Sequence, residues 1–121
     1  MKVKRITIEI KGLDEALKEA GRTYEKVSRG EQVGEKTGLY FGSLKDMRRV
    51  LTERRVELLK TIKEREPSSV YELAKMLRRD LKNVLQDISY LEELGLVEIT
   101  ETKDRKIPRV SYDKINFEVA L

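Results

Sequence analysis

The stretch of residues 69–97 constrains the fold of this chain more than any other part of the sequence. Ser69 is followed three residues later by Glu72, which is the spacing of a capping box at the start of a helix. The apolar residues that follow predict a short helix over residues 70–77. Three polar residues, Arg78-Arg79-Asp80, then interrupt the apolar periodicity. This short helix therefore ends in a tight break.

A longer helix is predicted directly after the break, over residues 81–94. Its buried face is given by three apolar residues at positions i, i+4 and i+7: Val84, Ile88 and Leu91. Gly95 suits the end of this helix, because glycine readily adopts the left-handed backbone that is common there. A short capped helix, a tight break and a longer helix are the pattern of a helix-turn-helix, whose second helix lies in the major groove of DNA.

Apolar periodicity predicts further elements before this segment. In order, they are a strand over residues 3–10, a helix over 13–27, a loop over 28–37 with Gly30 and Gly34, a short buried strand over 39–41, and helices over 44–50 and 53–64. Ser43 and Thr52 are the predicted N-caps of the last two helices. Pro67 follows them and stops the second one.

A hairpin and a last strand are predicted after the helix-turn-helix. The hairpin has strands over residues 96–99 and 107–112 around a polar tip, and Pro108 confines the returning strand to an edge. Apolar residues alternate again over residues 115–121, where we expect a strand that pairs with the first strand or with its copy in a partner chain. The predicted fold is therefore α+β, a winged helix-turn-helix with an N-terminal strand-helix-loop extension and a C-terminal strand.

We predict two parts along the chain. Residues 1–43 form the extension, which is expected to serve dimerisation, and residues 44–121 form a winged-helix DNA-binding domain with the C-terminal strand. The alternating apolar residues of the first and last strands leave edges that need a cover, and a second chain would provide one.

The predicted recognition helix carries polar residues near its N-terminus. Packing of its buried face leaves Lys82, Asn83 and Gln86 facing outward. The N-terminal part of a recognition helix is the part that meets base edges. Asparagine and glutamine bond adenine, and lysine reaches the acceptors of guanine. These three residues are the predicted base contacts.

Basic residues gather on both sides of this helix. The chain has 26 Lys and Arg against 22 Asp and Glu, a net charge of +4, and residues 45–55, 75–82 and 103–109 each carry a net charge of +3. Arg78 and Arg79 are predicted to hold phosphates. The predicted wing contacts to the backbone or the adjacent minor groove are Lys103, Arg105, Lys106 and Arg109.

The composition argues against several other functions. The chain has no cysteine and no histidine, which excludes thiol or histidine triads and the usual zinc sites. Neither the P-loop spacing nor the Rossmann fingerprint occurs. We therefore expect no enzyme, no cofactor and no metal. No apolar run approaches the roughly 20 residues of a membrane span, so we expect a cytoplasmic protein without a membrane partner.

The sequence resembles a family of short archaeal predicted transcriptional regulators, winged helix-turn-helix proteins broadly similar to the MarR and ArsR types. The resemblance is carried by Leu51-Thr52-Glu53-Arg54-Arg55-Val56-Glu57-Leu58-Leu59, Ser69-Val70-Tyr71-Glu72-Leu73-Ala74, Asn83-Val84, Asp87-Ile88 and Leu91-Glu92-Glu93-Leu94-Gly95-Leu96-Val97. It extends to residues 41–43 and 112–115 and so covers about the last two thirds of the chain. It implies double-stranded DNA as the partner and transcription regulation as the function.

The resemblance implies a recognition helix with an aromatic residue or more basic residues facing outward. Two leucines depart from this pattern and leave an alternative open. Leu81 and Leu85 occupy outward positions of the predicted recognition helix, which favours a protein partner on that face. The alternative function is therefore a protein-interaction module, in a transcription complex or as an antitoxin-like partner. A plain solvated helix face and an ordinary charged hairpin turn are the simpler interpretations of the same polar residues.

Overall fold

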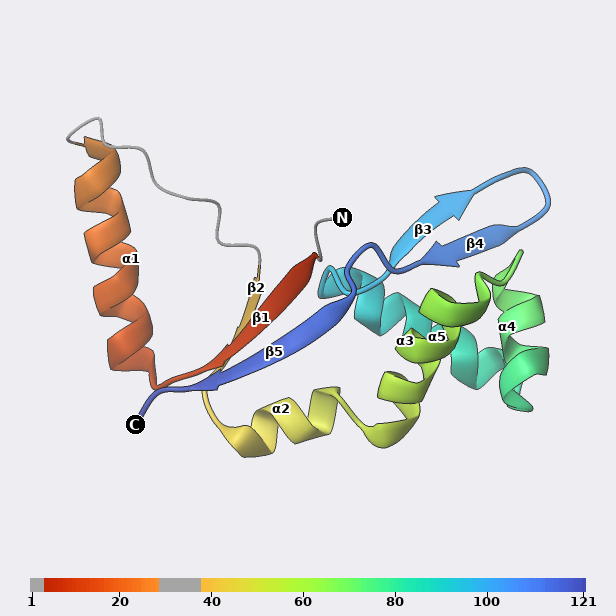
Figure 1. The fold of residues 1–121 in the computed structure, drawn as a ribbon, viewed down its shortest axis with the longest axis horizontal. Helices are drawn as coiled ribbons and strands as arrows, with labels where there is room; N and C mark the ends of the chain where they lie inside the picture. Colours follow the sequence, from red (N-terminus) through yellow and green to blue (C-terminus); the bar gives the residue numbers. More distant parts are fainter. Residues whose placement is uncertain (1–3, 29–37) are drawn as a thin grey trace. The chain divides into compact units, whose positions relative to one another are not determined.

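The computed structural model describes residues 4–28 and 38–121, and the side chains of residues 4–22 and 38–121. In chain order the elements are β1 (Arg5–Ile10), α1 (Leu13–Ser28), β2 (Gly38–Phe41), α2 (Leu44–Val50), α3 (Glu53–Arg65), α4 (Val70–Leu77), α5 (Leu81–Glu93), β3 (Glu98–Glu101), β4 (Lys106–Arg109) and β5 (Lys114–Val119) (Figure 1). The start of the predicted first strand and both glycines of the predicted loop lie outside the described residues.

The chain is an α+β protein with a winged-helix arrangement. Helices α3, α4 and α5 are followed by an antiparallel hairpin of β3 and β4, in which Ile99 lies opposite Pro108. The predicted fold class is confirmed, including the N-terminal strand and helix and the C-terminal strand. The residues between α5 and the wing differ from the prediction: Leu96 and Val97 are buried in a turn, and β3 begins only at Glu98.

Hydroxyl side chains begin three of the helices, as the sequence predicts. Each accepts a hydrogen bond from the backbone N–H three residues later: Ser43 from Asp46 at 3.1 Å, Thr52 from Arg55 at 3.3 Å and Ser69 from Glu72 at 3.0 Å. The return bond of the predicted capping box is displaced by one residue. The Glu72 carboxylate accepts from the N–H and the hydroxyl of Ser68, at 3.3 and 2.8 Å, and these bonds lower its pKa.

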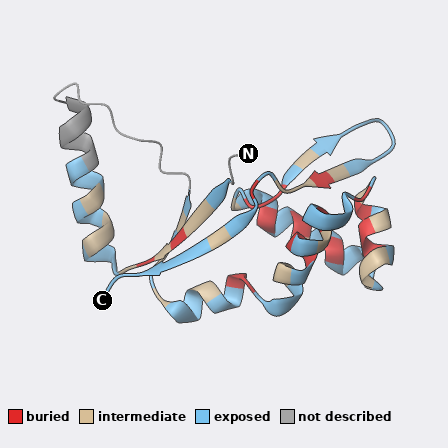
Figure 2. Ribbon diagram, viewed as in Figure 1, coloured by how far each residue is buried: buried red, intermediate tan, exposed pale blue. Residues whose placement is uncertain are grey.

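The described residues divide into two compact units. The first comprises Leu51–Asp113 with Lys4, and the second comprises the described parts of Arg5–Val50 with Lys114–Leu121. The core of the first unit is formed by apolar residues from its helices and from the turn after α5, among them Leu58, Ile62, Leu73, Val84, Leu91 and Leu96 (Figure 2). These units group residues 44–50 and the last strand with β1. The predicted division into a dimerisation extension and a DNA-binding domain after residue 43 stays a prediction.

The second unit contains a three-stranded sheet in the order β2-β1-β5. Both pairings of β1 are parallel, and Ile8 of β1 lies beside Leu39 of β2 and Phe117 of β5. The prediction that the last strand pairs with the first is therefore confirmed within one chain. Because partnered residues of parallel strands point to the same face, one face of this sheet is apolar and the other is polar.

The strand predicted over residues 39–41 forms, but the prediction that it is buried is wrong. Tyr40 is 44% exposed, and the other residues of β2 are at most half-buried. The physical reason is the position of β2 at an edge of the sheet, where the described part of the chain gives it a neighbouring strand on one side only.

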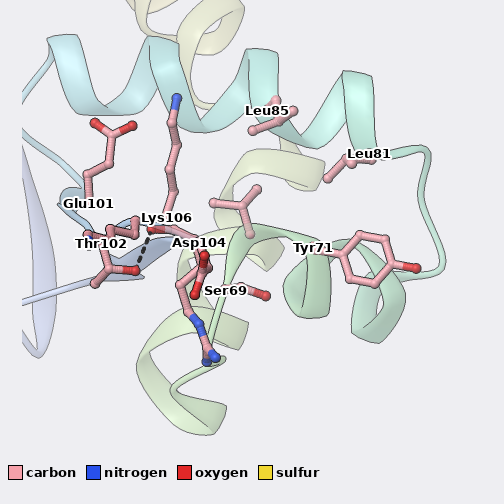
Figure 3. Close-up of a pocket in the computed structure, with 11 residues that line it drawn as sticks. Ser69, Tyr71, Leu81, Leu85, Glu101, Thr102, Asp104 and Lys106 are labelled. Carbon is pink, nitrogen blue, oxygen red and sulfur yellow. Dashed lines mark hydrogen bonds between the residues drawn. The ribbon is translucent and has the colours of Figure 1, made fainter.

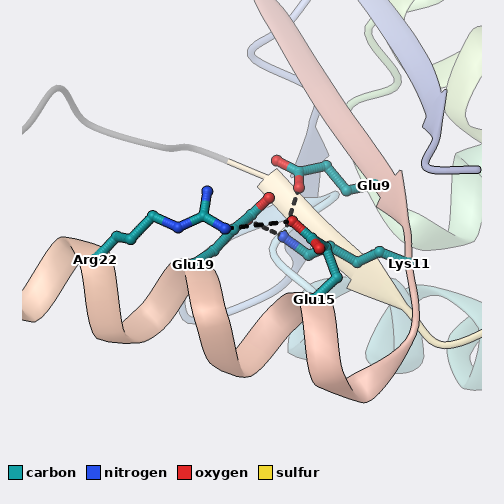
Figure 4. A network of polar contacts seen from close by, with 5 residues as sticks. All are labelled: Glu9, Lys11, Glu15, Glu19 and Arg22. Atoms are coloured by element: carbon teal, nitrogen blue, oxygen red, sulfur yellow. Dashed lines mark hydrogen bonds and ion pairs between the residues drawn. The ribbon is translucent and has the colours of Figure 1, made fainter.

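An ion-pair network joins the end of β1 to α1 (Figure 4). The ammonium group of Lys11 contacts the carboxylates of Glu9, at 2.7 Å, and Glu19. Hydrogen bonds to Glu19 and Glu9 raise the pKa of Lys11. Leu13 and Leu17, on the apolar stripe of α1, remain exposed.

Candidate functional site

The backbone between α4 and α5 sets the geometry of the helix-turn-helix. Arg78 ends α4 in the left-handed conformation, with φ at 53°. The Arg79 N–H donates back to the Ala74 carbonyl at 3.0 Å, so the last turn of α4 is closed without a glycine. Asp80 is the N-cap of α5, but its side chain makes no capping hydrogen bond.

The outward face of the N-terminal half of α5 is exposed to solvent. Val84, Ile88 and Leu91 are buried and fix the rotation of the helix. The predicted base contacts, Lys82, Asn83 and Gln86, are all exposed. They are not all brought together: Lys82 and Gln86 line a hollow beside the wing, whereas Asn83 lines another beside the turn and α3.

Arg79 occupies a different environment from the predicted one. Its Nη2 atom contacts Asp87 Oδ2 at 2.8 Å, and the other oxygen of Asp87 accepts from Arg55 Nε at 3.1 Å. The Asp87 side chain is only 14% exposed. This partly buried cluster ties the turn to α3 and α5, so Arg79 already has a structural use, whereas Arg78 is exposed. Phosphate contact by Arg79 remains a prediction.

Among the predicted wing residues, too, some are exposed and one is held by contacts within the protein. Lys103, Arg105 and Lys106 are exposed at or beside the turn between β3 and β4, which the Thr102 N–H closes by donating to the Arg105 carbonyl at 2.9 Å. Arg109 lies at the far end of β4. Its Nη1 atom donates to the carbonyls of Pro67, at 2.6 Å, and Pro108, at 2.7 Å. Arg109 therefore fastens the wing to the segment before α4.

The comparisons with known proteins assign the chain to a family. The model of the HVO_A0114 family matches residues 50–117, which is more than half of the chain. The chain belongs to the HVO_A0114 family. A comparison with curated proteins gives no match. The HVO_A0114 match contains the whole helix-turn-helix, the wing and most of β5.

A groove lies between α5, the start of α4 and the wing, inside the HVO_A0114 match. We call it the wing groove. It has a volume of about 550 Å³ and is lined by Ser69, Val70, Tyr71, Leu81, Leu85 and residues 101–106 (Figure 3). The side chains of Leu81 and Leu85 point from α5 toward it, and they are 36% and 37% exposed. The wing groove thus combines an apolar floor with charged residues from the wing.

A second hollow adjoins the wing groove along α5. Its volume is about 490 Å³, and its lining residues are Leu81, Lys82, Leu85, Gln86, Ser89 and Lys106. It brings two predicted recognition residues, Lys82 and Gln86, together with the wing residue Lys106. Three further residues line these hollows: Ser69 and Tyr71, from the start of α4, and Ser89 of α5. They are not among the predicted site residues, because the hollows form only where the wing folds beside the two helices.

The described residues show neither a metal-binding cluster nor a membrane-spanning helix. No group of three or more acidic, histidine or cysteine residues gathers there in a way that would hold a metal ion. In the same part of the chain, no helix has the length and apolar character that a membrane crossing requires.

Proposed function

We propose that this protein is a DNA-binding transcriptional regulator that acts as a homodimer. The observation that supports this most is the shared hollow in which Lys82 and Gln86 of α5 lie beside Lys106 of the wing. Polar side chains at the start of a recognition helix read base edges, and wing cations contact phosphates. In this proposal α5 enters the major groove and the wing follows the backbone.

Cations outnumber acidic residues at the turn of the wing, which suits contact with phosphates. Lys103, Arg105 and Lys106 are exposed, and the two acidic residues nearest them in sequence are Glu101 and Asp104. In a two-fold dimer, the two recognition helices would read half-sites about one helical turn, or roughly 34 Å, apart.

A titration with duplex DNA tests the proposal. Fluorescence anisotropy of a labelled random duplex should give a dissociation constant of about 10⁻⁴–10⁻⁶ M, with log affinity falling linearly with log salt. Lys82→Glu should weaken binding about tenfold or more, because it places a negative charge on the face of α5 that meets DNA.

Lys60→Glu is the matched control for that variant. Lys60 is exposed on α3 and lies outside the basic clusters, so the substitution changes the net charge by the same amount. It should leave affinity within about threefold of the wild type, since net charge acts weakly at physiological salt. Equal losses for the two variants, or no binding by the wild type at low salt, would contradict the assigned face.

A protein-interaction module is the second candidate, and the apolar floor of the wing groove favours it. Leu81 and Leu85 are exposed there beside Tyr71. The ammonium group of Lys75 lies over the Tyr71 ring, 4.5 Å from its centroid. Leu85→Gln separates the candidates because it removes apolar surface without changing charge. A DNA-binding protein should keep its DNA affinity within about threefold. A protein-interaction module should lose its partner in co-purification.

A further inference from the structure

The outer edge of β5 has no strand partner in the part of the chain that the structure describes. The strand lies at the end of the sheet. The Ala120 N–H donates to the Ile10 carbonyl at 2.9 Å, which directs the backbone groups of the even-numbered residues toward β1. Because backbone direction alternates along a strand, those of Ile115, Phe117 and Val119 point to the free edge.

The apolar face of the sheet is incomplete at this edge. Ile8 and Ile10, in the central strand, are buried. Their partners in β5, Phe117 and Val119, are 52% and 46% exposed. Large apolar side chains on an open strand edge are an aggregation hazard unless a further strand or chain covers them.

The polar face of β5 carries a positive charge near its start and a negative charge near its end. Lys114, Asn116 and Glu118 follow one another on this face, and all are exposed. Within the chain, Lys114 lies beside Arg5, and Glu118 lies beside Glu9. Like charges directly opposite one another are destabilising in a sheet, so neither pairing favours the isolated chain.

We propose that β5 pairs antiparallel with β5 of a second copy of this chain, with the two-fold axis at Asn116. In this register Lys114 lies opposite Glu118 of the partner subunit, and Ile115 lies opposite Phe117 of the partner subunit. The pairing creates two ion pairs, continues the apolar face across the axis and joins the two sheets into one of six strands.

The charges select this register among the symmetric ones. A two-fold axis at Ile115 places Lys114 opposite Asn116, and an axis at Phe117 places Lys114 opposite Ala120. Both alternatives lose both ion pairs. The edge of β5 is thus complementary to itself only when the axis passes through Asn116.

The inference rests on the homodimer of the proposed function and adds its interface. It is tested on the protein without DNA, so failure to bind DNA leaves it standing, and failure of this interface leaves DNA binding standing.

Charge reversal provides the first test, by sedimentation equilibrium. Lys114→Glu and Glu118→Lys each turn both ion pairs into like-charge pairs, and each should raise the dimer dissociation constant about tenfold or more. Either single variant removes a like-charge neighbour within its own chain, so loss of the dimer would not reflect loss of folding. The matched control is the double variant, Lys114→Glu with Glu118→Lys, which restores both pairs and should dimerise within about threefold of the wild type.

Mixing the two single variants sharpens this test. In a mixed dimer every charge at the interface again meets its opposite, so native mass spectrometry should show the heterodimer in excess of either homodimer. A wild type that stays monomeric at about 100 μM would overturn the proposal. Single variants that dimerise as well as the wild type would also overturn it, and the exposed Leu13 and Leu17 of α1 would then be the next candidate interface.

A single cysteine reports the register. The chain has no cysteine of its own. Asn116 would face its own copy in a non-hydrogen-bonded pair with about 4.5 Å between the Cα atoms, which a disulfide can span. Mild oxidation of Asn116→Cys should therefore give a covalent dimer. Lys114→Cys is the control and should remain uncrosslinked, because its copies lie more than about 10 Å apart in this register. The opposite pattern would overturn the assigned axis.

Discussion

At the scale of single residues, Tyr112 shows how a buried polar group is used in this protein. Its hydroxyl donates a hydrogen bond to the Leu96 carbonyl at 3.0 Å, which fastens the end of the wing to the turn after α5. Burial raises the pKa of the Tyr112 hydroxyl to about 12, because the charged phenolate is disfavoured away from water.

This environment predicts a dependence of stability on alkaline pH. The unfolded chain releases the Tyr112 proton near pH 10, while the folded protein holds it to about pH 12. The stabilisation is thus complete below pH 10 and is lost as the pH rises toward 12, by an amount on the order of 2 kcal/mol. Urea unfolding of the wild type over this pH range would measure the fall.

Tyr112→Phe is the comparison for that profile. It should cost about 1–2 kcal/mol at neutral pH, since the Leu96 carbonyl loses its buried donor. Above pH 10 its stability should fall less than that of the wild type, so the two curves converge. Parallel curves for the two proteins would show that other groups cause the alkaline loss.

Hydrogen bonds between neighbouring residues could be predicted from the sequence, whereas those between distant residues could not. The caps by Ser43, Thr52 and Ser69 are confirmed because each bond spans three residues and depends on local geometry alone. The partners of Arg79 and Arg109 could not be predicted. Arg109 Nη1 donates to a carbonyl 42 positions earlier in the chain, and only the folded wing brings the two together.

At the scale of elements, the Asp87 cluster fixes α5 against its neighbours. One carboxylate of α5 receives an arginine from α3 and an arginine from the turn before α5. The Arg55 guanidinium also lies over the Tyr90 ring, 4.6 Å from its centroid. The exposed residues of α5 are thus positioned by these polar contacts as well as by the buried apolar face of the helix.

Removing Asp87 should therefore destabilise the helix-turn-helix. Asp87→Ala leaves two arginines close together and partly buried without their shared carboxylate. We expect a loss of about 2–3 kcal/mol in the free energy of unfolding, slightly below the range for fully buried pairs. Asp80→Ala is the matched control, because this side chain makes no capping bond, and it should cost less than about 0.5 kcal/mol. Thermal unfolding by circular dichroism would compare them, and equal losses would refute the role of the cluster.

The helices could be predicted better than the strands. In α5, three apolar residues on one face determine both the helix and its rotation, and the structure confirms this face. In β2, an apolar sequence indicates a strand but does not indicate whether neighbours cover it. The position of β2 at the edge depends on β1 and β5, which are distant in sequence.

At the scale of the whole molecule, the two compact units interleave along the chain. The second unit is built from segments on both sides of the first. No change in composition marks these crossings, since the charged and apolar residues are mixed throughout. The sequence could therefore indicate the winged helix and the pairing of the first and last strands, but not the membership of the units.

The parallel pairing of β1 with β5 has a consequence for the order of events during synthesis. The two strands come together across a separation of about a hundred residues, as the bond between Lys4 and Asp113 illustrates. On the ribosome, β1 emerges first and β5 last among these elements. The helix-turn-helix and its wing can assemble in between, because their contacts are local. Until β5 is synthesised, the isoleucines of β1 lack the strand beside which they lie in the folded protein. We therefore expect closure of the sheet to be the slow and aggregation-sensitive step.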